Sequence, residues 1–408
     1  MKNKLIENVF SLLTLKGAEY VVQFITLPYL LRVLGPDKYG AIIFAQAIIN
    51  YGILFVDYGF NITAPRDIAR TKKSELGQQF SAIFLAKLCL FICILLTCIV
   101  FLSTIGFDDI LLLICVFPSL LGNVIFPIWF FQGIQQMRFI TIFNLIARSV
   151  SVIGIFSFVN HPNDYYLAAI FQSSVPVLAG VISLHTIYVK YPMVFVKPKL
   201  EDVRKKIYDG WDIFISTLFI NLYTNTNVFL LGLLTDTTVV GYYSAASKLI
   251  DAVKGVMMPV SNAVFPHVSL LFKESKKKAI SFLCKILHYT IVTTFILSLM
   301  VFLFSEQFVS VIMGISYGES IKVLRIISFL PFIVGMSNIF GIQTMVAFGM
   351  QRMFSRILMF SALLNFVLVC PMIYMWQGVG LAITVVIVES FVTITMYMAL
   401  RKNNIVLQ

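Results

Sequence analysis

Twelve long apolar runs constrain this chain more than any other feature of its sequence. Each run is long enough to cross the hydrocarbon core of a bilayer as a helix, which needs roughly 20 residues. Charged residues make up only 12% of the sequence, well below the roughly 25% usual in soluble domains. The sequence therefore predicts an all-α integral membrane protein with twelve transmembrane helices, at residues 11–31, 40–60, 80–102, 110–131, 139–159, 165–188, 211–233, 240–265, 282–304, 323–346, 354–375 and 378–400.

Lys and Arg residues collect in alternate connections between these runs. With the N-terminus placed in the cytoplasm, 22 of the 31 Lys and Arg residues lie on the cytoplasmic side, and the opposite connections hold only Arg32, Lys38 and Lys322. Membrane proteins keep an excess of Lys and Arg in their cytoplasmic loops. This distribution predicts two cytoplasmic termini, and it explains the net charge of +12 without a nucleic-acid partner.

The largest cytoplasmic connection covers residues 189–210. Within it, Leu200, Val203 and Ile207 share one helical face, and the opposite face is basic. This pattern is typical of a helix lying at the membrane surface, in contact with membrane lipids. We expect residues 189–210 to link two six-helix lobes, at 1–188 and 211–408.

The two predicted lobes share a sequence pattern. LLRVLGPDKYGAIIFAQAI (30–48) aligns with LLGLLTDTTVVGYYSAASKLI (230–250), so that Gly40 falls on Gly241 and Ala45 on Ala246. Internal repeats with charges buried inside membrane helices are typical of transporters.

Residue patterns of known catalytic and metal sites are missing from the sequence. The four histidines and six cysteines are scattered without metal or catalytic spacing, and there is no phosphate-binding glycine-rich loop. We therefore expect neither an enzyme nor a protein with a cofactor or a bound metal.

Charged and amide side chains inside the predicted helices are the candidate functional residues. A charge at the bilayer centre costs a few kcal/mol or more, so that several of them indicate a hydrated cavity. The candidates for substrate binding are Lys16, Glu19, Arg148, Lys248, Asp251, Lys254, Asn221 and Asn225. The candidates for coupling transport to an ion, H⁺ or Na⁺, are Asp57 and Glu389.

Two alternatives apply to these charges. Lys16 with Glu19, and Lys248 with Asp251, have the spacing of internal ion pairs that only neutralise each other. Four further charges lie near predicted membrane edges: Arg32, Asp57, Lys87 and Asp212. Because a long side chain can reach water there, their position favours the interpretation that they do not take part in transport.

Among the charged side chains inside the predicted helices, cations slightly outnumber acids and concentrate toward the cytoplasmic half of the membrane. The cations are Lys16, Lys87, Arg148, Lys248 and Lys254, and the acids are Glu19, Asp57, Asp251 and Glu389. That arrangement favours an anionic substrate, such as a lipid-linked diphosphate, over a cationic drug.

Four stretches also resemble a known family: LLRVLGPDKYG, DYGFNITAPRDIAR, GYYSAASKLIDAV and PVSNAVFPHVS. They are similar to the polysaccharide-biosynthesis (Wzx, O-antigen flippase) family of the multidrug/oligosaccharidyl-lipid/polysaccharide exporter superfamily. The resemblance implies two six-helix lobes around a central cavity, in the bacterial inner membrane. It implies a flippase that moves an undecaprenyl-diphosphate-linked oligosaccharide, an O-antigen or similar repeat unit, to the outer leaflet by alternating access. A polysaccharide polymerase would be the expected partner. Lys16, Lys248 and Lys254 match the family's cavity cations by helix, whereas the second helix offers Asp57 and no deep cation.

Two alternative functions stay open at this point. A multidrug or metabolite exporter of the same superfamily would need a compact acidic pocket, which only Asp57, Asp251 and Glu389 could form. A membrane polysaccharide polymerase or ligase would need a large outer loop with catalytic Arg or His. The longest outer connection has only about 16 residues, SEQFVSVIMGISYGES.

Overall fold

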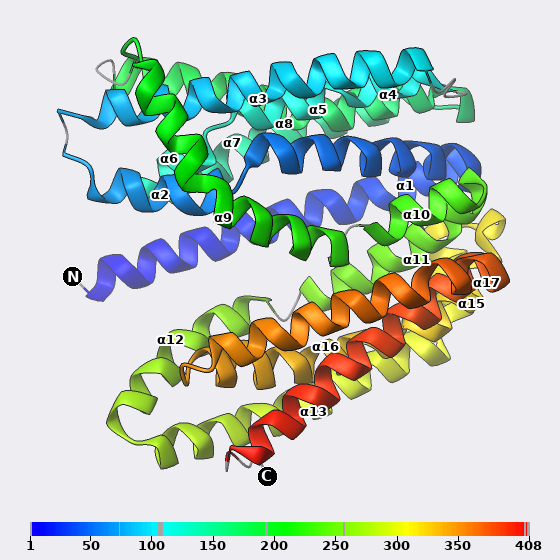
Figure 1. Cartoon of the computed structure of the whole chain (residues 1–408). Helices are drawn as coiled ribbons and strands as arrows, with labels where there is room; N and C mark the ends of the chain where they lie inside the picture. The colour runs from blue at the N-terminus through cyan, green and yellow to red at the C-terminus, as the bar shows by residue number, and fades with distance from the viewer. Residues whose placement is uncertain are drawn as a thin grey trace. The chain divides into compact units, whose positions relative to one another are not determined.

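The protein is almost entirely helical. The computed structural model describes residues 2–72, 74–104, 109–191, 195–224, 226–255, 258–403 and 405. Within these ranges it does not describe the side chains of residues 2–21, 23, 24, 99–104, 216, 219, 220, 222–224, 258–260, 262, 263, 266 and 273. It is 89% helical, and the described part contains no strand. Within each of two compact units, long helices run side by side (Figure 1).

The first unit comprises Met1–Leu34 and Ile42–Asn221. Its longest element is α1 (Lys2–Asp57), which breaks at Gly35, where a φ of 71° requires the conformational freedom of glycine. The other elements of this unit are α2 (Phe60–Arg70), α3 (Leu76–Thr104), α4 (Ile110–Val116), α5 (Pro118–Ile125), α6 (Ile128–Gly133), α7 (Met137–Phe158), η1 (Pro162–Asp164), α8 (Tyr165–Lys190) and most of α9 (Leu200–Thr224).

The second unit comprises Gly35–Ala41 and Leu222–Gln408. Its longest element is α17 (Gln351–Lys402), which breaks at Gln377, where φ is 49°. The elements before it are α10 (Thr226–Leu234), α11 (Thr237–Gly255), α12 (Met258–Glu274), α13 (Lys276–Leu303), α14 (Ser305–Phe308), η3 (Val309–Met313), η4 (Ile315–Tyr317), α15 (Ser320–Ile327), α16 (Leu330–Asn338) and η5 (Ile339–Val346).

Eight helical stretches of the described residues are long and apolar enough to cross a membrane. Two of them, Ile25–Arg70 and Gln351–Lys402, each contain the break described above. The second holds two predicted helices, and the first holds 40–60 and the end of 11–31. The predicted helices 211–233 and 240–265 fall on α9–α10 and α11–α12, and residues 225, 256 and 257 within them lie outside the described residues. An all-α multi-pass membrane protein is thus confirmed, whereas the number of twelve crossings stays a prediction.

The turn GPDKYG belongs to the second unit although it lies inside α1. The hydroxyl of Thr237, at the start of α11, donates a hydrogen bond to the carboxylate of Asp37. The two stretches that align with each other in the sequence therefore also contact each other in the fold.

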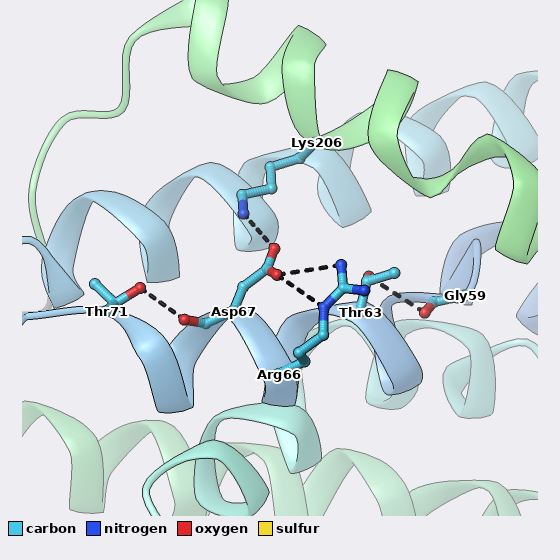
Figure 2. A network of polar contacts seen from close by, with 6 residues as sticks. All are labelled: Gly59, Thr63, Arg66, Asp67, Thr71 and Lys206. Carbon is cyan, nitrogen blue, oxygen red and sulfur yellow. Dashed lines mark hydrogen bonds and ion pairs between the residues drawn. The ribbon is translucent and has the colours of Figure 1, made fainter.

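A network of polar contacts joins α9 to α2 within the first unit (Figure 2). Lys206 Nζ lies 2.6 Å from Asp67 Oδ2, and Arg66 Nε lies 3.5 Å from Asp67 Oδ1. Val203 is only 5% exposed, and Ile207 packs against the same core cluster, whereas Leu200 is 80% exposed. Within the predicted segment 189–210, α9 therefore begins at Leu200, and two of its three apolar residues pack in the core of the first unit. The division of the chain into lobes at 188 and 211 stays a prediction.

Candidate functional site

A cavity of about 520 Å³ lies within the second unit. Its walls come from α11, α12, α13, α16 and η5. Most of its lining is apolar, with polar side chains on several of these elements. The lining residues are Lys254, Ser261, Val264, Phe265, Ile286, Thr290, Pro331, Val334, Gly335, Asn338, Ile339, Ile342, Gln343 and Val346. Of the predicted substrate-binding residues whose side chains the structure describes, Lys254 lines this cavity.

Three side chains of the lining form a hydrogen-bonded cluster. Ser261 Oγ donates to Asn338 Oδ1 over 2.8 Å, and Gln343 Nε2 donates to Ser261 Oγ over 2.8 Å. Gln343 Nε2 also donates to the backbone oxygen of Ser261 over 2.9 Å. Gln343 is 1% exposed, yet its Oε1 atom has no hydrogen-bond partner among the residues that the structure describes. The cluster thus joins α12 to the α16–η5 segment and leaves one amide oxygen uncommitted.

A π-helix brings Asn338 and Gln343 together. In an α-helix, with 3.6 residues per turn, residues five apart lie on different faces. The segment η5 has i→i+5 geometry instead, and Thr344 Oγ1 donates to the oxygen of Ile339, five residues earlier, over 2.7 Å. Gln343 Nε2 consequently lies 3.5 Å from Asn338 Oδ1. Such π-helical turns often occur at functional sites.

Asp251 pairs with a different lysine from the one expected. Lys254 Nζ lies 2.7 Å from Asp251 Oδ1, three residues away on α11, and the two side chains are 32% and 50% exposed. Lys248 is exposed and has no ion pair with any residue that the structure describes. Both lysines lie three residues from Asp251 along the helix, so that spacing alone does not select the partner.

In the first unit, Lys87 forms a buried ion pair with Asp57. Lys87 Nζ lies 2.8 Å from Asp57 Oδ1, and the side chains are 1% and 20% exposed. The ammonium group also donates to the backbone oxygen and to Oδ1 of Asn123, each over 3.1 Å. Asn61 Nδ2 donates to the second carboxylate oxygen of Asp57 over 2.9 Å. The expectation that Lys87 reaches water at the membrane edge is therefore wrong.

These contacts use all the donors of Lys87. An ammonium group has three N–H donors, and the three acceptors around Lys87 occupy them. A buried charge is tolerated only when it is paired and hydrogen-bonded, and for Lys87 on α3 the partners lie on α1 and α5. The geometry therefore makes Lys87 a tie between three helices and leaves it no donor for a substrate.

The other candidates lie at separate places in the fold. Arg148 on α7 and Glu389 on α17 are half-buried. Asn221 is half-buried too, and its Nδ2 donates to the oxygen of Thr217 over 2.9 Å. The side chains of Lys16 and Glu19, and the whole of Asn225, lie outside the described residues.

Sequence reasoning missed two members of the polar cluster. Gln343 is recognisable as an amide in an apolar run, but Ser261 and Asn338 are single polar residues in ordinary helical context. Asn365 was missed as well; its Nδ2 donates to Asn227 Oδ1 over 2.9 Å and joins α17 to α10. Lone amides inside two apolar runs were the available signal for this last pair.

Comparison with known proteins gives consistent matches over nearly the whole chain. The model of the family described as "Polysaccharide biosynthesis protein" matches residues 5–272. A protein of Escherichia coli (strain K12) described as "Putative O-antigen transporter" is 33% identical over 408 residues, which covers 99% of this chain and 98% of that protein. A protein of Shigella dysenteriae with the same description is 28% identical and covers 97% of this chain and 100% of its own length.

Solved structures share the fold at low sequence identity. The structure "Lipid II flippase MurJ, inward closed conformation" has a TM-score of 0.74 and 12% identity, and covers 95% of this chain and 87% of that one. The inward-facing conformation of a multidrug resistance MATE family transporter has a TM-score of 0.70 and 12% identity. This match covers 94% of this chain and 98% of that one. At this identity the likeness concerns the fold alone.

Proposed function

The chain belongs to the polysaccharide biosynthesis protein family, and from this membership we propose that it transports a polysaccharide repeat unit across the bacterial inner membrane. More specifically, the proposed activity is that of a flippase. It would move an undecaprenyl-diphosphate-linked oligosaccharide from the cytoplasmic to the outer leaflet by alternating access. The observation that carries this proposal is the similarity along 99% of the chain to a protein described as an O-antigen transporter.

The charge distribution supports the proposed direction of transport. With both termini in the cytoplasm, the lysine- and arginine-rich connections face the compartment where the lipid-linked substrate would be loaded. We propose that Lys16, Arg148, Lys248 and Lys254 provide positive charge for the diphosphate group. Hydrogen bonds between an ammonium group and a phosphate are among the strongest in proteins. Lys254 supports this role best because it lines the cavity of the second unit.

Asp57 and Glu389 are the proposed candidates for coupling transport to an ion, H⁺ or Na⁺. Both oxygens of Asp57 already accept hydrogen bonds, from Lys87 and from Asn61. Glu389 lies half-buried on α17. A polysaccharide polymerase acting on the exported repeat unit is the proposed partner in the membrane.

A multidrug exporter is the second candidate function, and the fold shared with the MATE family transporter is what favours it. Such an exporter would need acidic side chains free for a cationic drug. Two of the three candidate acids, Asp57 and Asp251, are already paired with lysines. These two ion pairs are the reason for which we rank the exporter second.

A clean deletion in the host bacterium tests the proposal. We expect surface polysaccharide to disappear while lipid-linked repeat units accumulate in the inner leaflet, and both changes to be reversed by the gene on a plasmid. Normal surface polysaccharide in a deletion strain with no second copy of such a gene would reject the flippase. Increased sensitivity to cationic drugs with normal polysaccharide would support the exporter instead.

A further inference from the structure

We propose that the start of α7 and the end of α8 form a binding site for an anionic phospholipid, with Arg138 and Lys190 as the ligands of its phosphate group. The site lies within the first unit, and it does not depend on which substrate the protein transports. Three observations support it: the two cations lie at one membrane edge, they contact the same aromatic ring, and exposed apolar side chains surround them.

Arg138 and Lys190 lie at the same edge of the membrane. Met137–Phe158 and Pro162–Lys190 are both long and apolar enough to cross a bilayer. The helices α7 and α8 pack against each other, and only the short connection 159–164 joins them, so that they run antiparallel. The start of α7 and the end of α8 are therefore level with the lipid phosphates, and the cytoplasmic leaflet carries anionic lipids that attract Lys and Arg.

The contacts around Phe139 bring the two cations together. Lys190 Nζ lies 4.5 Å from the centroid of the Phe139 ring, and Arg138 Cζ lies 5.3 Å from it. Cations at such distances are attracted by the face of an aromatic ring. The hydroxyl of Tyr191 donates to Gln136 Oε1 over 2.9 Å and thereby ties the end of α8 to the start of α7. Both charges are thus held beside one ring.

The ring of Phe139 is itself fixed by the core of the unit. Its centroid lies 5.8 Å from that of Phe131 and 5.7 Å from that of Phe143, and both of these residues are buried. Aromatic pairs at such separations stabilise a packed core. The cations therefore rest on a rigid surface, and a headgroup that binds them meets a site formed in advance.

Neither cation is neutralised by an acid. Arg138 and Lys190 are exposed, and neither forms an ion pair with any residue that the structure describes. The stretches 134–143 and 186–200 hold four Lys or Arg residues and no Asp or Glu. Like charges held close together repel each other, and a bound anion removes that repulsion. An unpaired basic cluster at a membrane edge therefore favours an anionic headgroup over one without net charge.

Exposed apolar side chains border the two cations and distinguish a lipid from other anionic partners. Met137 on α7 is 50% exposed, and Tyr188 on α8 is 66% exposed. The ring of Phe195, which is also exposed, has its centroid 6.1 Å from that of Tyr188. Such side chains enter the acyl-chain boundary of a bilayer while neighbouring cations meet the phosphates. A nucleic acid or an acidic protein segment would leave these apolar groups in water.

The site differs from the lipid contact that the sequence pattern predicts. That prediction rests on Leu200, Val203 and Ile207, of which the last two pack in the core of the first unit. The exposed apolar and basic side chains that suit a lipid lie before α9 instead, on α7, on α8 and at Phe195.

Lipid binding to the purified full-length protein in an uncharged detergent tests the site. The probe is phosphatidylglycerol with a fluorescent acyl chain, and phosphatidylcholine with the same chain has the same phosphate but no net charge. Inorganic phosphate, added as a competitor, separates a lipid site from a site for free phosphate. Arg138→Gln/Lys190→Gln removes both charges at exposed positions. Lys276→Gln/Lys277→Gln is the matched control, because it removes two exposed lysines at the start of α13, also on the predicted cytoplasmic side.

We expect phosphatidylglycerol to bind the wild type at least fivefold more tightly than phosphatidylcholine. Arg138→Gln/Lys190→Gln should raise the Kd for phosphatidylglycerol at least fivefold, and the control variant should change it less than twofold. The exchange Arg138→Lys/Lys190→Arg, which keeps both charges, should preserve most of the affinity. An unchanged Kd in the Arg138→Gln/Lys190→Gln variant, an equal loss in the control variant, or equal affinity for the two lipids would overturn the site. Full displacement of the lipid by inorganic phosphate would overturn it as well and would assign the two cations to a free anion.

Discussion

Gly40 and Gly241 approach each other so closely that neither position has room for a side chain. A Cβ atom on Gly40 would lie 1.8 Å from the backbone oxygen of Thr237, and one on Gly241 would lie 2.0 Å from the backbone oxygen of Pro36. These are the two glycines that align in the sequence repeat. The repeat therefore preserves a contact between backbones within the second unit, and not only a resemblance between helices.

Replacing either glycine by alanine should destabilise the second unit. Overpacking typically costs about 1–3 kcal/mol, and more where the opposing atoms belong to the backbone and cannot move aside. We expect Gly40→Ala and Gly241→Ala each to lower the Tm of the detergent-purified protein by several degrees. Gly318→Ala is the control, because its nearest neighbour lies at 4.0 Å. Equal Tm values for all three variants would show that this contact is looser than described.

The buried pair between Lys87 and Asp57 gives a second prediction. Removing one partner of a buried pair costs about 3–5 kcal/mol because the other charge stays buried without compensation. Lys87→Met should therefore lower the Tm strongly, and adding Asp57→Asn should recover a large part of the loss. Thermal unfolding of the single and double variants measures this coupling.

The matched control for this pair is Lys278→Met. Lys278 Nζ lies 3.8 Å from Glu274 Oε2 in a pair that is 69% and 64% exposed, and such surface pairs contribute about 0–1 kcal/mol. Its Tm should equal that of the wild type. A double variant at Lys87 and Asp57 no more stable than Lys87→Met would show that the hydrogen bonds to Asn123, and not the ion pair, provide the stability.

The sequence was sufficient to predict the helices but not their partners. Apolar length indicated an all-α membrane protein, although the number of crossings stays a prediction. The repeat indicated that the turn at Gly40 matters. The burial of Lys87 was not predictable, because its acceptor Asn123 lies on another helix far along the chain. The meeting of Asn338 with Gln343 was equally hidden, since it depends on a π-helical segment that no residue pattern announces. Long-range pairing and local departures from α-helical geometry are the features that periodicity does not encode.

The start of α9 separates two apolar residues that the sequence treats alike. Val203 is 5% exposed in the core cluster of the first unit, and Leu200 is 80% exposed. Val203→Ser should destabilise this unit by about 1–3 kcal/mol, because it loses apolar burial and gains a buried hydroxyl. Leu200→Ser should leave the Tm unchanged. If both substitutions have the same small effect, the segment is a surface helix, as the sequence pattern alone predicts.

The orientation in the membrane is testable by labelling. Single cysteines at Asp37 and at Asn163, in an otherwise cysteine-free background, should react with an impermeant maleimide added to intact spheroplasts. A cysteine at Ser74, in the connection after α2, should react only after permeabilisation, because that connection carries the positive charge typical of the cytoplasmic side. Labelling at Ser74 in intact spheroplasts would reverse the proposed direction of transport.

The pair between Lys254 and Asp251 distinguishes a substrate ligand from a structural ion pair. Both side chains are partly exposed, so that the pair contributes no more than about 1 kcal/mol to stability. Lys254→Ala should nevertheless reduce polysaccharide export at least tenfold at a normal protein level in the membrane. Lys254→Arg should retain part of the export, since the charge survives while the geometry changes.

The double variant Lys254→Ala/Asp251→Ala decides between the two roles. If Lys254 contacts the substrate, removing its partner restores nothing, and export stays low. If Lys254 only neutralises Asp251, the double variant exports normally, and Lys254 is rejected as a ligand. Lys322→Ala is the matched control, because Lys322 forms a pair of the same i,i+3 spacing with Glu319 at 2.9 Å, outside the lining of the cavity. Its export should equal that of the wild type, which would show that losing such a pair does not by itself impair transport.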